Sequence, residues 1–312
     1  MSLLKRLVFA GHRAAARVGL HVLPRHYYSS VADLHELEAT RSTWARRSEM
    51  AGVEWDIAAQ ERALREICLP CRDEYAANDT YRAAVASEVG PGYGPVEAQA
   101  LHAVVRRFRP RRIIEVGSGV STACLRAAAG LNARDAGSRV RITCIEPYPS
   151  GALQALGDVD LVSRPVQSVP AAFFEELGEG DLLFIDSSHS AKTGSDVVYL
   201  FLEVLPRLRP GVVVHVHDIY LPYDYSPMSL ETLWHWNETA FLHALLIDNR
   251  RLKTLFCLSL LHHDRRDVLE ELFPGYDPEP MTDGLVSDAV GPLEYPSRHF
   301  PCATYLQVVE DR

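Results

Sequence analysis

Two short stretches carry titratable side chains at spacings that suit chemistry. The first reads Asp186-Ser-Ser-His189, and the second reads His215-Val-His217-Asp218. Carboxylates and imidazoles held together can bind a metal ion or move a proton, and histidine titrates near neutral pH because its ordinary pKa is about 6.5. Each stretch ends an apolar run that reads as a strand. In doubly wound sheets ligands bind at the carboxyl ends of the strands, so both stretches are candidates for an active site.

A third stretch, residues 113–122, reads IIEVGSGVST and predicts a strand, a glycine turn and the start of a helix. Such a turn lets the backbone approach a ligand, and a helix N-terminus favours polar oxygens. Glu146 ends the next expected strand and places a carboxylate at the same edge of the sheet. A nicotinamide-binding site would favour G-x-G-x-x-G, but Thr122 stands where the third glycine would be.

The elements that would position these stretches alternate along the chain. Seven apolar runs are expected to be strands: 112–117, 140–146, 159–163, 181–186, 211–218, 252–260 and 303–309. Helical segments separate the first five, which favours a parallel sheet covered on both faces. We therefore expect an α/β fold with a Rossmann-like, doubly wound, seven-stranded sheet.

The N-terminal part of the chain is organised differently. Residues 31–88 are rich in helix-forming residues, and the Gly- and Pro-rich segment 90–95 marks a boundary. We expect a helical extension or lid over 1–89 and the α/β domain over 90–312. The first residues form an amphipathic basic pattern that suits a membrane surface, or a helix docked on its own domain or on a second subunit.

Composition narrows the class of protein. The 312 residues include 47% hydrophobic and 23% charged residues, and the net charge of −9 argues against nucleic acid as the main partner. No apolar run reaches the 18 or so residues that a membrane span needs. Without a signal peptide, the six cysteines are expected to be thiols in a cytoplasmic protein. Cys68 and Cys71 form a C-x-x-C, but no second ligand pair with zinc spacing accompanies it.

Four segments together resemble a known family. EVGSGVST, CIEP, FIDSSH and HVHDIYLP resemble the class I S-adenosylmethionine-dependent methyltransferases, and more narrowly the small-molecule O-methyltransferase branch that contains catechol and sugar methyltransferases. The resemblance covers about residues 90–310 and implies S-adenosyl-L-methionine as the cofactor. The cofactor-binding residues that it implies are Glu115, Gly117, Ser118, Gly119, Ser121, Thr122, Glu146, Pro147, Gln167 and Asp186.

The same resemblance implies roles for the titratable residues. Catechol-type enzymes hold a divalent metal with an acidic residue after the fourth strand and an acidic pair after the fifth, which places Asp186, His217 and Asp218 as metal ligands here. A histidine in this set suits Mn²⁺, Fe²⁺ or Zn²⁺ better than Mg²⁺, and a site without metal stays open. His189 occupies the family's basic position, so the expected catalytic residues are His189, Asp186 and Asp218.

Aromatic residues are candidates for the substrate pocket. The segment 221–238 follows the fifth strand and is aromatic-rich, with Asn237 and Glu238 as polar groups among the aromatic residues. The candidate substrate contacts are Tyr28, Tyr93, Tyr223 and Trp236. We expect O-methylation of a hydroxyl on a sugar, polyketide or phenolic metabolite, and a homodimer is a candidate assembly. Two alternatives stay open: other chemistry of the same cofactor, such as N-alkylation or cyclisation, and a non-catalytic cofactor-binding subunit.

Overall fold

The computed structural model describes residues 3–23, 26, 28, 29, 31–87, 89, 92–137, 139–232, 234–278, 280–286 and 298–310. The chain divides into two compact units, Met1–Trp44 and Ala45–Arg312. The smaller unit contains α1 (Leu3–Ala16), α2 (Leu34–Ala39) and α3 (Arg41–Trp44). The functional division that the sequence predicts, with residues 1–89 as a lid, stays a prediction.

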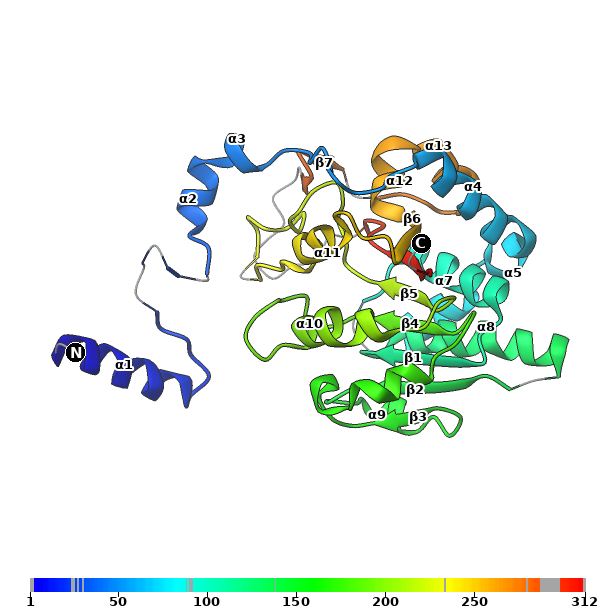
Figure 1. Cartoon of the computed structure of the whole chain (residues 1–312), viewed down its shortest axis with the longest axis horizontal. Helices are drawn as coiled ribbons and strands as arrows, with labels where there is room; N and C mark the ends of the chain where they lie inside the picture. Colours follow the sequence, from blue (N-terminus) through cyan, green and yellow to red (C-terminus); the bar gives the residue numbers. More distant parts are fainter. Residues whose placement is uncertain are drawn as a thin grey trace. The chain divides into compact units, whose positions relative to one another are not determined.

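The larger unit is built on one seven-stranded sheet (Figure 1). Its strands are β1 (Arg112–Val116), β2 (Arg141–Ile145), β3 (Asp160–Val162), β4 (Leu182–Ile185), β5 (Val213–Val216), β6 (Leu252–Cys257) and β9 (Thr304–Val308). They are ordered β3-β2-β1-β4-β5-β9-β6, and β9 runs antiparallel to both of its neighbours. The other pairs are parallel, which confirms the expected doubly wound sheet.

One predicted strand is shorter than expected. The apolar run 252–260 leaves the sheet after Cys257, and α12 (Leu258–Asp264) begins there. Leu258, Leu260 and Leu261 are fully buried in this helix. A short apolar run suits a buried helix as well as a buried strand, so hydrophobic periodicity could not place the boundary. A small hairpin of β7 (Met281–Thr282) and β8 (Leu285–Val286) lies outside the main sheet.

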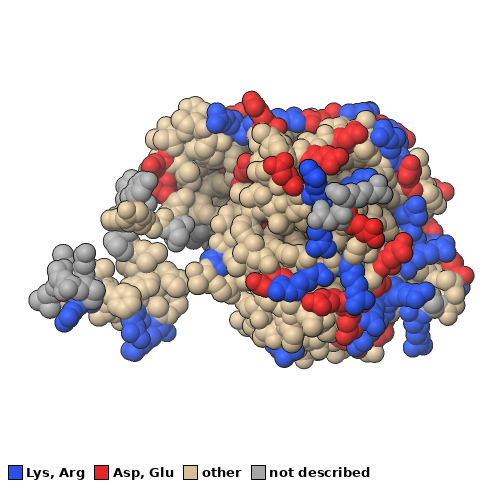
Figure 2. Space-filling view, viewed as in Figure 1, with Lys and Arg blue, Asp and Glu red and all other residues tan. Residues whose placement is uncertain are grey.

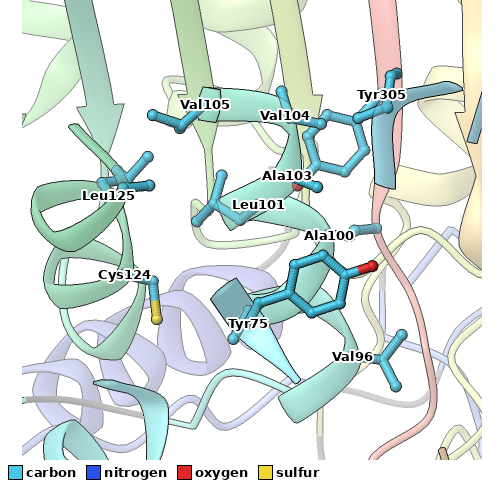
Figure 3. Close-up of a cluster of buried hydrophobic side chains, with 14 of the residues drawn as sticks. Tyr75, Val96, Ala100, Leu101, Ala103, Val104, Val105, Cys124, Leu125 and Tyr305 are labelled. Atoms are coloured by element: carbon cyan, nitrogen blue, oxygen red, sulfur yellow. The ribbon is translucent and has the colours of Figure 1, made fainter. Parts of the chain in front are cut away.

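Two hydrophobic cores lie on the two faces of the sheet. Alternate residues of β4 divide between them, with Leu182 and Phe184 in the first core and Leu183 and Ile185 in the second. Figure 3 shows the first core, where side chains of α7 (Pro95–Phe108) and α8 (Val120–Ala136) pack with Tyr305 of β9. The first core also takes side chains from α4 (Ile57–Cys68), α5 (Arg72–Tyr75), α6 (Asp79–Ala86) and α13 (Arg266–Leu272). The second takes them from α10 (Asp196–Tyr199), the following π-turn (Leu200–Val204) and α11 (Glu238–Leu246).

The start of α8 is fixed at the carboxyl end of β1, where the predicted glycine turn lies. Gly119 precedes the helix, and its backbone N–H donates to Thr122 Oγ1 at 3.1 Å. A side chain in the first turn that returns to the residue before the helix satisfies a backbone donor that would otherwise lack a partner. The remaining short helices are α9 (Gly151–Gln154) and the 3₁₀ turns Leu69–Cys71, Val166–Ser168, Ala171–Glu176 and Leu205–Arg207.

The distribution of surface charge and the length of the helices can be compared with the expectation that the protein neither binds nucleic acid nor spans a membrane. On the face of the larger unit seen in Figure 2, Lys and Arg side chains are interspersed with Asp and Glu. No helix among the described residues is long and apolar enough to cross a membrane. The absence of a nucleic-acid partner, the homodimer and the cytoplasmic location stay predictions.

The cysteines are thiols, as expected. All six are free and buried. Burial, helped by the nearby charge of Glu74, raises the pKa of Cys71 to about 11, which makes this thiol a poor nucleophile at neutral pH. Among the described residues, neither member of the Cys68/Cys71 pair lies in a cluster that could hold a metal ion.

Candidate active site

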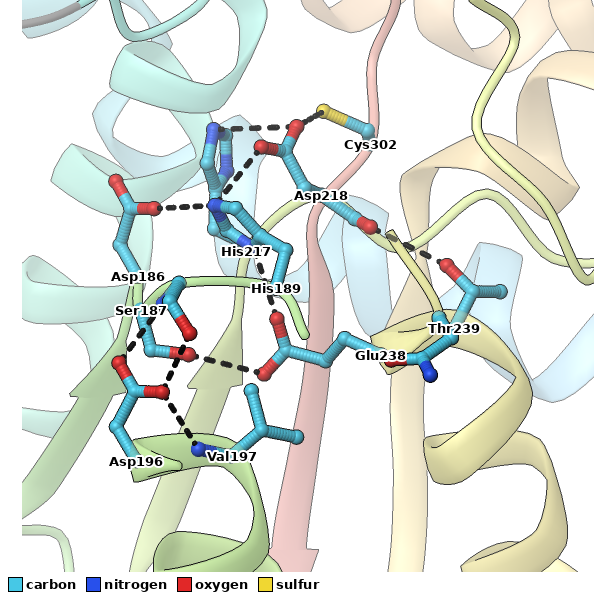
Figure 4. A network of polar contacts seen from close by, with 12 residues as sticks. Asp186, Ser187, His189, Asp196, Val197, His217, Asp218, Glu238, Thr239 and Cys302 are labelled. Carbon is cyan, nitrogen blue, oxygen red and sulfur yellow. Dashed lines mark hydrogen bonds and ion pairs between the residues drawn. The ribbon is translucent and has the colours of Figure 1, made fainter. Parts of the chain in front are cut away.

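The carboxyl ends of β4 and β5 bring three titratable side chains together (Figure 4). The two strands are parallel, with Ile185 paired to Val216, so the residues that follow them emerge side by side. His189 Nε2 lies 3.3 Å from Asp186 Oδ1 and 3.2 Å from Asp218 Oδ2. The three residues proposed as catalytic from the sequence therefore form one cluster.

A buried carboxylate from another element orients His189. Glu238 is the first residue of α11 and is 1% exposed, and its Oε2 lies 2.8 Å from His189 Nδ1. The Trp236 ring packs 4.6 Å from the imidazole, and the backbone N–H groups of Asn237 and Glu238 donate to the carbonyl of His189. These contacts hold His189 at a positive φ of 54° and leave Nε2 facing the two aspartates.

The surroundings of His189 change the role that the sequence assigned to it. Burial alone would lower its pKa, but the charge of Asp218 and the contacts with Asp186 and Glu238 raise the pKa well above the ordinary value. In the absence of another cation, the imidazole is therefore protonated at neutral pH. The prediction of a free base titrating near pH 6.5 needs this correction, because three carboxylates converge on one ring.

His217 lies beside Asp218 but outside the Asp186 cluster. Its Nε2 is 3.8 Å from Asp218 Oδ1, the oxygen that faces away from His189. Among the described residues, the groups close enough to share one ion are Asp186–His189–Asp218 and His217–Asp218–Cys302. The predicted set of Asp186, His217 and Asp218 is therefore divided: His217 faces the first core with Tyr93, and His189 takes its place.

The Asp186–His189–Asp218 cluster fits a divalent metal. If His189 Nδ1 donates its proton to Glu238, a neutral imidazole would aim a lone pair at two carboxylate oxygens. That arrangement needs a cation between them, either a proton on Nε2 or a metal ion. One nitrogen and two oxygen donors suit Mn²⁺, Fe²⁺ or Zn²⁺, and a carboxylate behind the imidazole is the usual support of a metal-bound histidine.

The glycine turn after β1 touches the same site. Gly117 has a φ of +88°, and a Cβ built on it would lie 2.2 Å from the backbone carbonyl oxygen of Asp186. Only glycine allows the turn to approach the end of β4 this closely. The predicted cofactor loop and the titratable cluster are therefore adjacent.

Three predicted cofactor contacts are buried beneath that turn. Glu115 is fully buried, and its carboxylate accepts hydrogen bonds from Ser121 Oγ and Thr122 Oγ1, both at 2.7 Å, and from Cys144 Sγ at 2.9 Å. Ser121 and Thr122 are 3% and 1% exposed. Their contacts anchor the start of α8 to β1 and β2 and leave almost no surface for a direct contact with a ligand.

Burial raises the pKa of Glu115 to about 7, although its three hydrogen bonds act in the opposite direction. The folded state therefore holds a proton that the unfolded chain releases near pH 4.5. The stabilisation is complete below that pH and is lost as the pH rises through about 7. We expect Glu115→Gln, which carries no titratable proton, to remove this loss, worth about 3 kcal/mol in the free energy of unfolding.

Denaturant unfolding of both proteins at about pH 5 and pH 8.5 measures the effect. The difference in stability between the variant and the wild type should shift in favour of Glu115→Gln at the higher pH. Taking the difference cancels every other titrating group. An equal pH dependence in the two proteins would show that Glu115 is ionised in the fold throughout.

The residue predicted to bind the ribose, Glu146, is partly accessible to solvent. Glu146 directly follows β2 and is half-buried, with Oε1 accepting from the backbone N–H of Tyr148 at 2.8 Å and Oε2 facing Ser118 Oγ at 3.3 Å. Pro147 beside it is also half-buried. Gln167 is exposed, and its side-chain amide donates to the carbonyl of Gly194 at 2.9 Å. Ser118 and Glu146 thus lie together at the mouth of the loop.

The four aromatic candidates lie in different surroundings. Trp236 contacts His189 and is half-buried, as a wall of the site would be. Tyr93 is only 2% exposed and packs 4.9 Å from the His217 ring, so it supports the site from the core and leaves almost no surface for a substrate. Tyr223 packs against Gly284 and the His263 ring. Tyr28 belongs to the smaller unit, where it is 85% exposed, and its role stays a prediction.

Comparison with known proteins finds a match for the central region of the chain. Residues 114–219 match a family model described as a methyltransferase domain. An uncharacterized protein of Archaeoglobus fulgidus is 28% identical over 183 residues, which is 55% of this chain and 81% of that protein. Residues 114–219 are thus similar to a methyltransferase domain, in the part of the chain that carries the four segments of the resemblance.

Three solved structures have a distantly similar fold. The O-methyltransferase TomG from Streptomyces achromogenes in complex with SAM is 15% identical, with 88% of this chain and 96% of that chain covered and a TM-score of 0.42. The SAH-bound Podospora anserina methyltransferase PaMTH1 is 14% identical, with 93% of this chain and 100% of that chain covered and a TM-score of 0.40. An O-methyltransferase from Bacillus cereus in complex with SAH is 15% identical, with 62% of this chain and 90% of that chain covered and a TM-score of 0.39.

Proposed function

We propose that this protein transfers the methyl group of S-adenosylmethionine to a hydroxyl of a small metabolite such as a sugar, polyketide or phenol, with a divalent metal at the Asp186–His189–Asp218 cluster. One observation supports this most directly. The cluster lies at the edge of the sheet where the glycine turn ends, and Gly117 abuts the backbone of Asp186. Cofactor loop and cluster are thus close enough to serve one reaction.

The reaction requires alignment and the loss of one proton. The hydroxyl oxygen forms a bond to the methyl carbon as the carbon–sulfur bond breaks, and the sulfonium becomes a neutral thioether. Holding the oxygen and the methyl group in line is the main contribution of the protein. The hydroxyl proton leaves to a carboxylate oxygen of Asp186, whose side chain is the more exposed of the two aspartates.

His189 and Glu238 hold these carboxylates in place. The Glu238 carboxylate keeps Nδ1 on its own side, so Nε2 stays between Asp186 and Asp218. A divalent ion bound by the three residues would supply positive charge that lowers the pKa of the substrate hydroxyl. Asp218 is held in turn by the Tyr220 hydroxyl, which donates to its Oδ1 at 2.9 Å.

Cofactor and substrate would occupy neighbouring surfaces. The backbone of Gly117, Ser118 and Gly119 would contact the amino-acid part of the cofactor, and Glu146 would accept the ribose hydroxyls. Pro147 and Gln167 would lie near the adenine. Trp236 and Tyr223 would form the wall for the acceptor, because Trp236 already contacts His189.

Conversion of S-adenosylmethionine, followed by mass spectrometry, tests the proposal. The protein is incubated with the cofactor, with and without a metabolite extract, and each sample is repeated with EDTA and with Mn²⁺, Zn²⁺ or Mg²⁺ restored. We expect S-adenosylhomocysteine and a methylated acceptor only when the extract and a metal are present. Conversion without any acceptor would indicate self-reaction of the cofactor, and no conversion with intact cofactor binding would indicate a non-catalytic subunit.

A further inference from the structure

A second group of possible metal ligands lies on the other side of Asp218. Val216 pairs with Thr304 in the antiparallel β5–β9 ladder, so continuing this register brings residue 302 opposite residue 218. The backbone N–H of Ile219 donates to the carbonyl of Cys302 at 2.6 Å, which holds the two segments together. Cys302 Sγ then lies 3.2 Å from Asp218 Oδ1.

The imidazole of His217 completes this group. The residue is 5% exposed, and its Nδ1 makes no hydrogen bond within the described part of the chain. Its Nε2 is aimed at Asp218 Oδ1 from 3.8 Å, which is too long for a hydrogen bond. The Tyr93 ring packs 4.9 Å from the imidazole and keeps it in this orientation.

The spacing of these atoms suits one ion. With metal–ligand bonds of about 2.0–2.3 Å, ligands of a tetrahedral zinc-type site lie about 3.3–3.7 Å apart. The observed separations of 3.2 and 3.8 Å are close to that range. The ligand atoms of His217, Asp218 and Cys302 all lie within 4.8 Å of one another, and three protein ligands leave a fourth position open.

The two oxygens of Asp218 face different groups. Oδ2 contacts His189, whereas Oδ1 accepts hydrogen bonds from Cys302 Sγ and the Tyr220 hydroxyl and faces His217. A metal ion would replace the Cys302 thiol proton at Oδ1, so one carboxylate lies between two sets of ligands (Figure 4). We propose that His217, Asp218 and Cys302 form a second metal site, which takes a zinc-type divalent ion and shares the Asp218 carboxylate with the Asp186–His189–Asp218 site. Thiolate and imidazole ligands select Zn²⁺, Co²⁺ or Fe²⁺ over Mg²⁺.

Glu97 is placed to hold the cysteine ligand. This residue of α7 is 1% exposed, and its Oε1 accepts the backbone N–H of Cys302 at 2.8 Å and lies 3.5 Å from Sγ. A bound ion takes the place of the thiol proton, which is released to solvent as the thiolate forms. Neither the site nor its test requires methyl transfer, so the proposal goes beyond the proposed function.

Metal stoichiometry of the full chain tests the second site. The protein is stripped with a chelator, dialysed against Zn²⁺ or Co²⁺ without cofactor, and analysed by elemental mass spectrometry. We expect two ions per chain in the wild type, and a thiolate-to-cobalt charge-transfer absorption in the near ultraviolet. Cys302→Ser, which keeps the hydrogen bond to Asp218, should bind one ion fewer and lose the absorption.

Two further variants separate this proposal from the first site. Asp186→Asn should lose the ion at the first site and keep the thiolate absorption. Cys124→Ser, which removes another buried thiol, should match the wild type in both measurements. A wild type that binds cobalt without thiolate absorption overturns the proposal, whatever its methyltransferase activity, and so does a Cys302→Ser protein with an unchanged ion count. The wild-type spectrum decides the question even if Cys302→Ser fails to fold.

Discussion

Replacing Asp218 by asparagine should lower kcat/KM by roughly 10³-fold, the largest loss that we expect from a single substitution in this protein. Asp218 supplies one of the two carboxylate oxygens next to His189 Nε2, at 3.2 Å, and its other oxygen faces His217 and Cys302. The neutral amide keeps the shape of the side chain but removes the negative charge from both proposed metal sites. Steady-state assays with saturating cofactor and metal measure the effect.

A matched control is available in another Asp–His pair of the same chain. Asp224 Oδ1 lies 2.7 Å from His243 Nδ1 outside the cluster, so Asp224→Asn removes a carboxylate from a histidine without touching Asp218. We expect its activity to stay within about twofold of the wild type. Cofactor affinity should also be preserved in Asp218→Asn, because Glu146 and the glycine turn are unchanged. Turnover of Asp218→Asn near the wild-type rate would remove Asp218 from the reaction.

The sequence predicts most of the sheet and the part of the site at the ends of β1, β4 and β5, because both depend on local sequence patterns. Strands β4 and β5 are buried on both faces and read as mainly apolar runs, and each is followed directly by a polar residue, Asp186 after β4 and His217 after β5. Parallel pairing then brings Asp186 and Asp218 together without any long-range information. The approach of Gly117 to Asp186 follows from the same strand-end geometry.

Glu238 and Cys302 could not be paired with the site from sequence. Glu238 lies 49 residues after His189, and Cys302 lies 84 residues after Asp218. Neither separation matches a helical or strand period, so no local rule links the partners. The raised pKa of His189 could not be predicted for the same reason, because Glu238, one of the three carboxylates around the ring, comes from a distant part of the sequence.

The sequence predicts Glu115 as a cofactor contact, but the alternation of side chains along the strand already indicates that its side chain points into the core. Side chains alternate along a strand, so Glu115 must point to the same face of the sheet as Ile113, which lies in the first core under α8. A carboxylate on that face contacts the start of α8 instead of the ligand. The residue types are therefore those of a cofactor-binding loop, but Glu115, Ser121 and Thr122 are buried and stabilise the loop from the protein core.

Replacing Glu238 by glutamine should weaken metal binding at the first site by about 10- to 100-fold, with a smaller loss of turnover once metal is saturating. The carboxylate behind His189 makes the imidazole more basic and keeps Nε2 toward the aspartates, whereas a neutral amide does neither as strongly. The activity of the variant should thus depend on metal concentration in a range where the wild type is already saturated.

Glu74→Gln is the matched control for this substitution. Glu74 Oε2 lies 2.9 Å from His102 Nε2 in a glutamate–histidine contact between α5 and α7, and neither residue belongs to a metal-ligand cluster among the described residues. We expect its metal dependence to match the wild type, even if its thermal stability falls. A Glu238→Gln protein with wild-type metal dependence, but with reduced activity at every metal concentration, would mean that Glu238 acts on substrate alignment through Trp236 and His189. Restored turnover at high metal would instead establish Glu238 as a positioning residue for the His189 ligand.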